Sequence, residues 1–165
     1  EGSWHLVSYG YTFCPDICPT TLSTLAVVAK RLAQNSDFTD VKILFYSVDY
    51  ERDTVERLAK YIPYFHTSFI GLTHAKRSQT DTYRAFEEGL GILSLTTPNI
   101  EENDLKPDRG ARTEYSVSHG VLLYLLNPKG ELQAIFKPTT DKDGTQHFTA
   151  EQVYYDYRAI RQYLG

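Results

Sequence analysis

Residues 4–19 read WHLVSYGYTFCPDICP, a segment that joins an apolar run to two closely spaced cysteines. The run Trp4–Tyr9 predicts a β-strand, which Gly10 ends. Pro19 suits the first turn of a helix, where its missing N–H costs nothing, and this places Cys18 at the N-cap. The segment therefore predicts a strand, a turn that carries both sulfurs, and the start of a helix.

The rest of the chain continues this alternation of strands and helices. Apolar residues spaced by three and four between Thr21 and Leu32 predict a helix facing a core. Val41–Val48 is almost continuously apolar, as expected of a strand covered on both faces. The remaining expected elements are a helix capped by Asp53 or Thr54 with an apolar stripe of Val55, Leu58, Ala59 and Ile62, a short buried strand at 68–72, a helix at 78–88, strands at 117–126 and 131–137, and a final helix capped by Thr149.

This order predicts an α/β fold of thioredoxin-like architecture, a single domain over residues 1–165. The expected core is a mixed, mostly parallel sheet with helices on both faces, closed by a C-terminal β-hairpin and helix. In open sheets of this kind, functional sites lie beyond the carboxyl ends of the strands. Cys14, Cys18 and Asp49 all follow strand ends, so we expect them at one edge of the sheet.

Composition excludes several classes of function. The 165 residues carry a net charge of −4, and the 17 basic residues are scattered rather than clustered, so no nucleic-acid partner is expected. No apolar stretch approaches the roughly 20 residues that span a bilayer. The chain contains no methionine, so we expect it to be part of a longer protein, with any membrane anchor or targeting segment upstream of Glu1.

The cysteines at a helix start suggest thiolate chemistry, because the positive end of a helix favours thiolate over thiol. Thiolates select copper(I) and zinc, but two sulfurs alone seldom complete a site, so a third ligand is expected elsewhere. Of the five histidines, His119 is the best candidate because it lies between a polar loop and an apolar strand. The other four are expected to be solvated or structurally hydrogen bonded: His5, His66, His74 and His147.

Three motifs resemble those of the SCO/SenC family of copper chaperones. The first is Gly10–Pro19 with its two cysteines, the second is Ser47–Thr54, and the third is the Val-Ser-His segment that ends at His119. Their order and approximate spacing match the family over nearly the whole chain. The family has a thioredoxin-like fold and assists assembly of the dinuclear copper centre of cytochrome c oxidase.

The resemblance implies that one copper ion, as Cu(I) or Cu(II), binds to Cys14, Cys18 and His119. It places Asp49, with Asp16, beside the ligands rather than among them. The implied partners are the copper-bearing subunit of cytochrome c oxidase or another copper protein, together with a copper donor and a thiol reductant. The implied location is the periplasmic face of a bacterial inner membrane or the mitochondrial intermembrane space, as the soluble domain of an anchored protein.

Other functions stay open on the sequence alone. Cys14 and Cys18 could form the redox pair of a thiol–disulfide oxidoreductase, although redox members of this fold typically use Cys-x-x-Cys. A peroxidase would need one cysteine of low pKa to attack peroxide, and nothing in the sequence distinguishes Cys14 from Cys18 in this respect. A third alternative is a binding or signalling module that has lost copper delivery. Zinc is the alternative metal, but it prefers four ligands. Residues 94–112 are expected to form a long surface loop, either a partner contact or a tolerated insertion.

Overall fold

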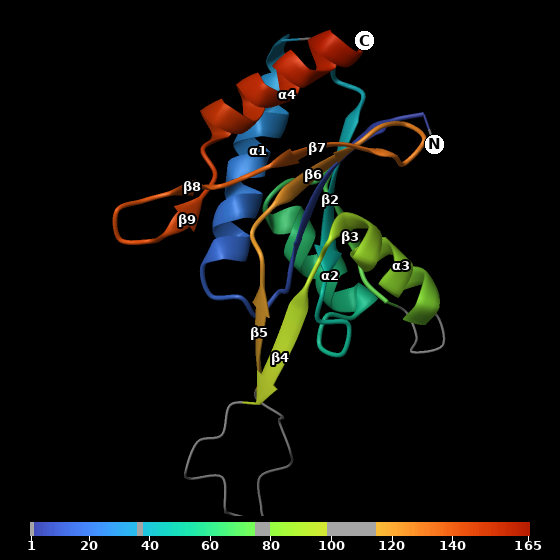
Figure 1. Ribbon diagram of the computed structural model, residues 1–165, viewed down its shortest axis with the longest axis vertical. Helices are drawn as coiled ribbons and strands as arrows, with labels where there is room; N and C mark the ends of the chain where they lie inside the picture. The colour runs from blue at the N-terminus through green and yellow to red at the C-terminus, as the bar shows by residue number, and fades with distance from the viewer. Residues whose placement is uncertain (1, 36–37, 75–79, 99–114) are drawn as a thin grey trace, which may run out of the picture.

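The computed structural model describes residues 2–35, 38–74, 80–98 and 115–165. A five-stranded sheet lies at its centre, with the strand order β3-β2-β1-β6-β7 (Figure 1). β1, β2 and β3 run parallel, whereas β6 is antiparallel to β1 and β7 is antiparallel to β6. The five strands are β1 (Trp4–Gly10), β2 (Val41–Ser47), β3 (Ile70–Leu72), β6 (Leu123–Leu126) and β7 (Leu132–Phe136).

Helices cover both faces of this sheet. They are α1 (Ile17–Asn35), α2 (Val55–Tyr61) with the short 3₁₀ turn η1 (Ile62–Tyr64), α3 (Thr80–Leu90) and α4 (Ala150–Leu164). Gly10 of β1 faces Cys18 of α1, and the Trp4 ring on the same face lies 4.3 Å from the Arg161 guanidinium of α4. On the opposite face, the Tyr46 ring packs against the ring of Phe86 in α3, with ring centroids 5.1 Å apart. Figure 1 shows α1 and α4 together on one side of the sheet and α3 on the other. The predicted mixed sheet with helices on both faces is confirmed.

The C-terminal elements follow the sequence signals closely. Asn127 accepts hydrogen bonds from the backbone N–H groups of Lys129 and Glu131 through Oδ1, and Gly130 has φ of +82°, so the turn between β6 and β7 needs a glycine there. Thr149 caps α4 by accepting a hydrogen bond from the Gln152 N–H. The predicted hairpin and final helix are confirmed.

Three local predictions were wrong. α1 begins at Ile17, so Cys18 and Pro19 both lie inside its first turn, and Cys18 is not the N-cap. β3 is an edge strand whose Ile70 is 40% exposed, so it is not buried. Val55 and Ala59 were expected on the core stripe of α2, yet both are exposed, and the buried members of this stripe are Leu58 and Ile62.

The largest difference lies between residues 94 and 126. The expected loop begins as strand β4 (Ser94–Pro98), which pairs antiparallel with β5 (Tyr115–His119). The single strand expected at 117–126 is therefore two strands, because the chain changes partner from β4 to β1 across residues 120–122. The part of the expected loop at 99–112 lies outside the described residues. A second short antiparallel pair precedes α4, formed by β8 (Thr139–Thr140) and β9 (Gln146–His147).

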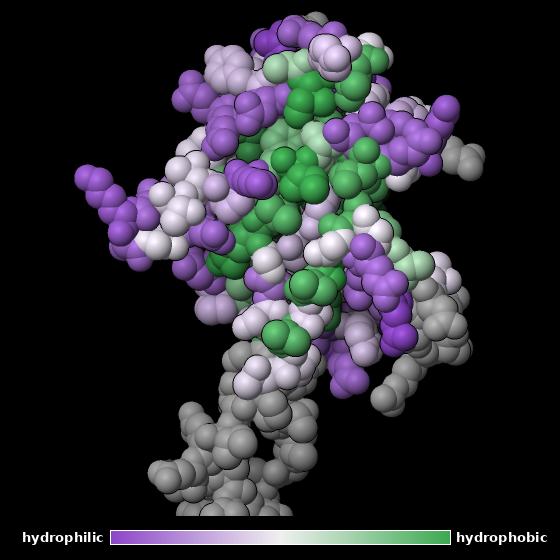
Figure 2. Space-filling view, viewed as in Figure 1, coloured by the Kyte–Doolittle hydropathy of each residue, from purple (hydrophilic) through white to green (hydrophobic). Residues whose placement is uncertain are grey.

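The core is large and apolar, with fully buried side chains from β1, β2, β6, α1 and α4. Figure 2 shows apolar side chains running down the middle of one face of the molecule, flanked by polar ones. Within the described residues, no helix combines the length and the apolar character needed to cross a membrane.

Candidate metal centre

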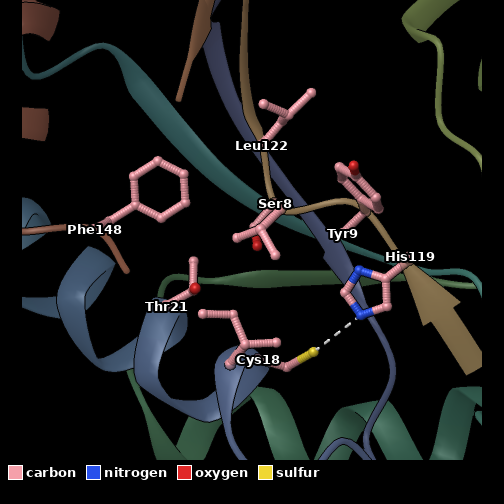
Figure 3. Close-up of a pocket in the computed structure, with 9 residues that line it drawn as sticks. Ser8, Tyr9, Cys18, Thr21, His119, Leu122 and Phe148 are labelled. Atoms are coloured by element: carbon pink, nitrogen blue, oxygen red, sulfur yellow. Dashed lines mark hydrogen bonds between the residues drawn. The ribbon is translucent and has the colours of Figure 1, made fainter. Parts of the chain in front are cut away.

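Cys14, Cys18 and His119 converge at the carboxyl end of β1. One ligand atom from each, the two Sγ atoms and one imidazole nitrogen, lie within 4.8 Å of one another. Cys18 Sγ is 3.6 Å from His119 Nε2 (Figure 3). In the part of the chain that the structure describes, this is the one group of three such side chains with metal-binding geometry. The structure thus brings together the three residues singled out from the sequence.

Both sulfurs are held by the turn between β1 and α1. The Cys14 N–H donates to the Tyr11 carbonyl, which closes a turn, and Cys18 follows in the first turn of α1. A Cβ atom added at Gly10 would collide with Cys18 Sγ, so glycine at this position makes room for the sulfur. Cys18 is 3% exposed and Cys14 is 9% exposed. The turn therefore shields both sulfurs from solvent, Cys18 more completely than Cys14.

The two thiols differ in acidity. A hydrogen bond from the Cys18 thiol lowers the pKa of Cys14 to about 4, helped by the backbone N–H of Asp16, and hydrogen bonding outweighs the opposing effect of burial. The pKa of Cys18 is raised, first because it donates that hydrogen bond and then because it is buried. The pair thus holds one proton on Cys18 and one negative charge on Cys14. A thiolate is therefore ready for a metal ion at neutral pH.

His119 is the last residue of β5 and is oriented by its own backbone neighbour. Its Nδ1 lies 2.7 Å from the Gly120 carbonyl oxygen, which can only accept, so Nδ1 carries the proton. The lone pair of Nε2 then faces the sulfurs. The rings of Tyr9 and Tyr11 flank the imidazole, with centroids 5.6 and 5.8 Å away. Hydrogen bonding and aromatic packing together fix both the tautomer and the direction of the ring.

Gly120 also matters for the space around this imidazole. A Cβ atom at Gly120 would lie 2.8 Å from the Tyr9 hydroxyl oxygen. A side chain there would push on the tyrosine that packs against His119. The small pocket beside Cys18 and His119 is also lined by Ser8, Thr21 and Leu122, as Figure 3 shows.

Asp53 is a residue whose role the sequence did not reveal. Its fully buried carboxylate accepts hydrogen bonds from the Thr12 N–H at 2.9 Å, the Thr12 hydroxyl at 2.5 Å and the Ser47 hydroxyl at 2.7 Å. It was expected only as a possible helix cap, but Thr54 caps α2 by accepting from the Arg57 N–H. Asp53 instead ties the cysteine turn to the end of β2. The sequence feature that could have indicated this role is the position of Asp53 within the Ser47–Thr54 motif.

The two carboxylates expected beside the ligands act differently. Asp49 is buried and forms an ion pair with Arg52, and its N–H donates to the Ser47 hydroxyl. Asp16 has an exposed side chain, and its backbone N–H is what contacts Cys14. Their influence on a bound metal stays a prediction.

The other histidines lie in structural environments. His66 Nδ1 bonds with Ser68, and His147 lies 3.5 Å from an Asp141 oxygen. His74 Nε2 is 2.7 Å from the Tyr46 hydroxyl and its ring stacks on Tyr83. His5 is partly exposed and lies in β1, the middle strand of the central sheet.

Comparison with known proteins assigns the chain to a family. The SCO1/SenC family model matches residues 1–153. The chain belongs to the SCO1/SenC family. It is 34% identical over 130 residues to the mitochondrial SCO2 homologue of Bos taurus, covering 79% of this chain and 44% of that protein. It is 32% identical over 142 residues to the mitochondrial SCO1 homologue 1 of Arabidopsis thaliana, covering 86% of this chain and 38% of that protein.

Solved structures of SCO1/SenC proteins share the fold. The crystal structure of Arabidopsis thaliana ScoI with copper bound has a TM-score of 0.72 and 29% sequence identity, and the match covers 98% of this chain and 86% of that one. The thioredoxin-like architecture and the family resemblance read from the three motifs are thereby confirmed. The chain spans less than half the length of the two SCO1/SenC homologues named above.

Proposed function

We propose that this chain is a copper metallochaperone that binds one copper ion through Cys14, Cys18 and His119. The observation that carries the proposal is the convergence of two sulfurs and one imidazole nitrogen within 4.8 Å. Thiolates suit Cu(I), and adding an imidazole gives a mixed sulfur–nitrogen set that also holds Cu(II). The Arabidopsis relative, 29% identical, was solved with copper bound, which supports the choice of metal.

The arrangement of the ligands favours a carrier over a permanent metal site. The cysteines lie on the β1–α1 turn, whereas His119 lies on the two-stranded sheet formed by β4 and β5, which is separate from the central sheet. A site with three ligands from two elements opens more readily than a closed four-ligand site. Zinc prefers four ligands, and within the described residues the group holds three. The donor set therefore fits a transferable copper ion better than a structural zinc.

The recipient that we propose is the copper-bearing subunit of cytochrome c oxidase, whose dinuclear centre members of this family help to assemble. A copper donor protein and a thiol reductant would complete the cycle, because both sulfurs must be reduced before they bind Cu(I). The two SCO relatives described above are mitochondrial proteins. This supports the mitochondrial intermembrane space as the location. We also propose the bacterial periplasm as the equivalent compartment and an anchor that holds the domain at the membrane.

A second candidate function is thiol–disulfide exchange by Cys14 and Cys18. The observation that favours it is the closeness of the two sulfurs, which lie within 4.8 Å of each other. The lowered pKa of Cys14 would make its sulfur the nucleophile and leave Cys18 to resolve a mixed disulfide. The exchange would oxidise the dithiol to a disulfide while reducing the disulfide of its substrate. Robust reductase turnover of metal-free protein that survives His119→Ala would favour this enzyme over the chaperone.

Titration of the reduced protein with Cu(I), in competition with a chromophoric Cu(I) chelator, tests the proposal. We expect one Cu(I) per chain, lost in Cys14→Ser and Cys18→Ser. Asp49→Ala should weaken binding less than either cysteine change, because Asp49 pairs with Arg52. Equal losses in all three variants would make Asp49 a ligand, and failure of the wild type to compete would refute the copper site.

A further inference from the structure

An exposed aromatic residue immediately precedes the first cysteine of the site. Phe13, the residue before Cys14, is 49% exposed. The guanidinium of Arg57 lies 3.9 Å from the centroid of its ring, and the guanidinium of Arg52 lies 4.9 Å from it. Both distances are within the range of cation–π contacts. We call Phe13, Arg52 and Arg57 the arginine–phenylalanine surface.

The charges at this surface are arranged with the acids inside and the bases outside. Arg52 forms an ion pair with Asp49, and Arg57 Nε lies 3.8 Å from a carboxylate oxygen of Asp53. The net charge of these four side chains is zero. The two carboxylate side chains are 2% and 0% exposed, whereas those of Arg52 and Arg57 are 21% and 43% exposed. Of these four groups, solvent and any partner therefore meet the two cations, although the chain as a whole carries a net charge of −4.

The side chain of Arg57 is held in one orientation by contacts with Thr12 and Phe13. Its Nε donates to the Thr12 hydroxyl at 2.5 Å, and its guanidinium carbon lies over the Phe13 ring. Among the residues that the structure describes, its two terminal nitrogens make no hydrogen bond. A guanidinium fixed in this way loses little rotamer freedom when it binds a carboxylate through two parallel hydrogen bonds. Arginine and aromatic residues are also enriched at the energetic centres of protein interfaces.

We propose that the arginine–phenylalanine surface docks the protein that receives the metal, and that this acceptor carries a carboxylate beside its own metal site. This inference rests on the proposed function. The carboxylate would pair with Arg57 and an apolar side chain would cover Phe13, which brings the acceptor against Cys14. The exposed side chains of Asp16 and Glu51 lie at nearby sequence positions and disfavour an extended polyanion. A folded protein with a localised acidic group fits this charge pattern best.

The test is the rate of Cu(I) transfer to the purified copper-bearing domain of cytochrome c oxidase, measured by stopped flow at several ionic strengths. The variants are Arg57→Gln, Arg57→Lys, Phe13→Ala and the control Lys129→Gln. Lys129 is exposed in the β6–β7 turn. Wild-type transfer should slow as salt is added, because electrostatic attraction speeds association. Arg57→Gln should lower the low-salt rate about tenfold and flatten the dependence on salt.

The slope against salt separates docking from damage to the cysteine turn. A merely structural defect would slow transfer at every ionic strength and leave the slope unchanged. Arg57→Lys should keep most of the salt dependence while transferring more slowly. Phe13→Ala should lower the rate at all salt concentrations with the slope intact, and an unchanged Cu(I) affinity and unfolding temperature of this variant distinguish lost docking from damage to the cysteine turn. A wild-type slope in Arg57→Gln, or an equal effect of Lys129→Gln, would overturn the docking surface while leaving the chaperone function standing. Absence of transfer from the wild type would overturn both.

Discussion

Cys18 Sγ lies 3.6 Å from His119 Nε2, although 101 positions separate the two residues in the sequence. The contact joins two separate parts of the fold, since Cys18 belongs to the first turn of α1 and His119 ends β5. The Gly120 carbonyl fixes the proton on Nδ1 and so directs the lone pair of Nε2 toward the sulfur. This one approach converts a pair of cysteines into a three-ligand site.

Removal of the imidazole should weaken copper binding without unfolding the domain. His119→Ala deletes one of three ligands, so we expect Cu(I) affinity to fall at least about tenfold, which corresponds to about 1.4 kcal/mol. The side chain is only partly buried at a strand end, so the unfolding temperature should change little. Competition against a Cu(I) chelator and thermal unfolding measure the two effects. His66→Ala is the matched control, and an unchanged affinity in His119→Ala would contradict the ligand assignment.

Gly10 should be intolerant of a single added methyl group. In Gly10→Ala the new Cβ would meet Cys18 Sγ, so either the sulfur or the strand must move. We expect a loss of about 1–3 kcal/mol of unfolding free energy and weaker Cu(I) binding. Gly89→Ala is the control, because Gly89 lies in α3 with open space around the position of a Cβ, and this change should stabilise by about 0.5–1 kcal/mol. Equal behaviour of the two variants in urea unfolding would argue against close packing of Gly10 on the sulfur.

Asp53 should contribute more to stability than its place at a helix start suggests. Asp53→Ala removes the acceptor of three hydrogen bonds and leaves buried donors on Thr12 and Ser47 without a partner. We expect a loss of about 3 kcal/mol or more. The exposed Asp156 of α4 provides the comparison, and Asp156→Ala should change stability by less than about 0.5 kcal/mol. Chemical denaturation that gave similar values for both would show that Asp53 does not secure the cysteine turn.

The acidity of Cys14 leads to a distinct pH dependence of its reactivity. A thiol with a lowered pKa is thiolate above that value, so Cys14 with a pKa of about 4 is charged across the range from about pH 6 to 8. Its alkylation by iodoacetamide should be nearly independent of pH there, whereas an ordinary thiol reacts about tenfold faster with each added pH unit. Cys18, whose pKa is raised, should react slowly throughout. Mass spectrometry of the alkylated peptides distinguishes the two, and a steep pH dependence at Cys14 would contradict the assigned thiolate.

The sequence predicted the elements whose signals are local. The apolar run before Gly10, the stripe of α1 and the cap at Thr149 each reflect short-range spacing or capping chemistry, and the structure has all three elements. The cysteine pair is equally local, because the strand end and the helix start that hold it are adjacent in the chain. His119 could be singled out only by its odd placement before an apolar strand and by the family motif.

The features that were missed depend on contacts between distant segments. The pairing of β4 with β5 follows from a change of partner after His119. Residues 94–98 lack the regular alternation of apolar and polar side chains that predicts a strand. Asp53 looked like a helix cap because Thr12, its main partner, lies 41 positions away. The exposure of β3 is likewise decided by its place at the sheet edge, which no local pattern encodes.

X-ray absorption at the copper edge, on reduced protein loaded with one equivalent of Cu(I), tests the metal centre most directly. We expect two sulfur neighbours and one nitrogen neighbour, with the nitrogen contribution lost in His119→Ala and kept in His66→Ala. A spectrum with sulfur neighbours only in the wild type, or a nitrogen contribution that survives His119→Ala, would contradict the three-ligand site.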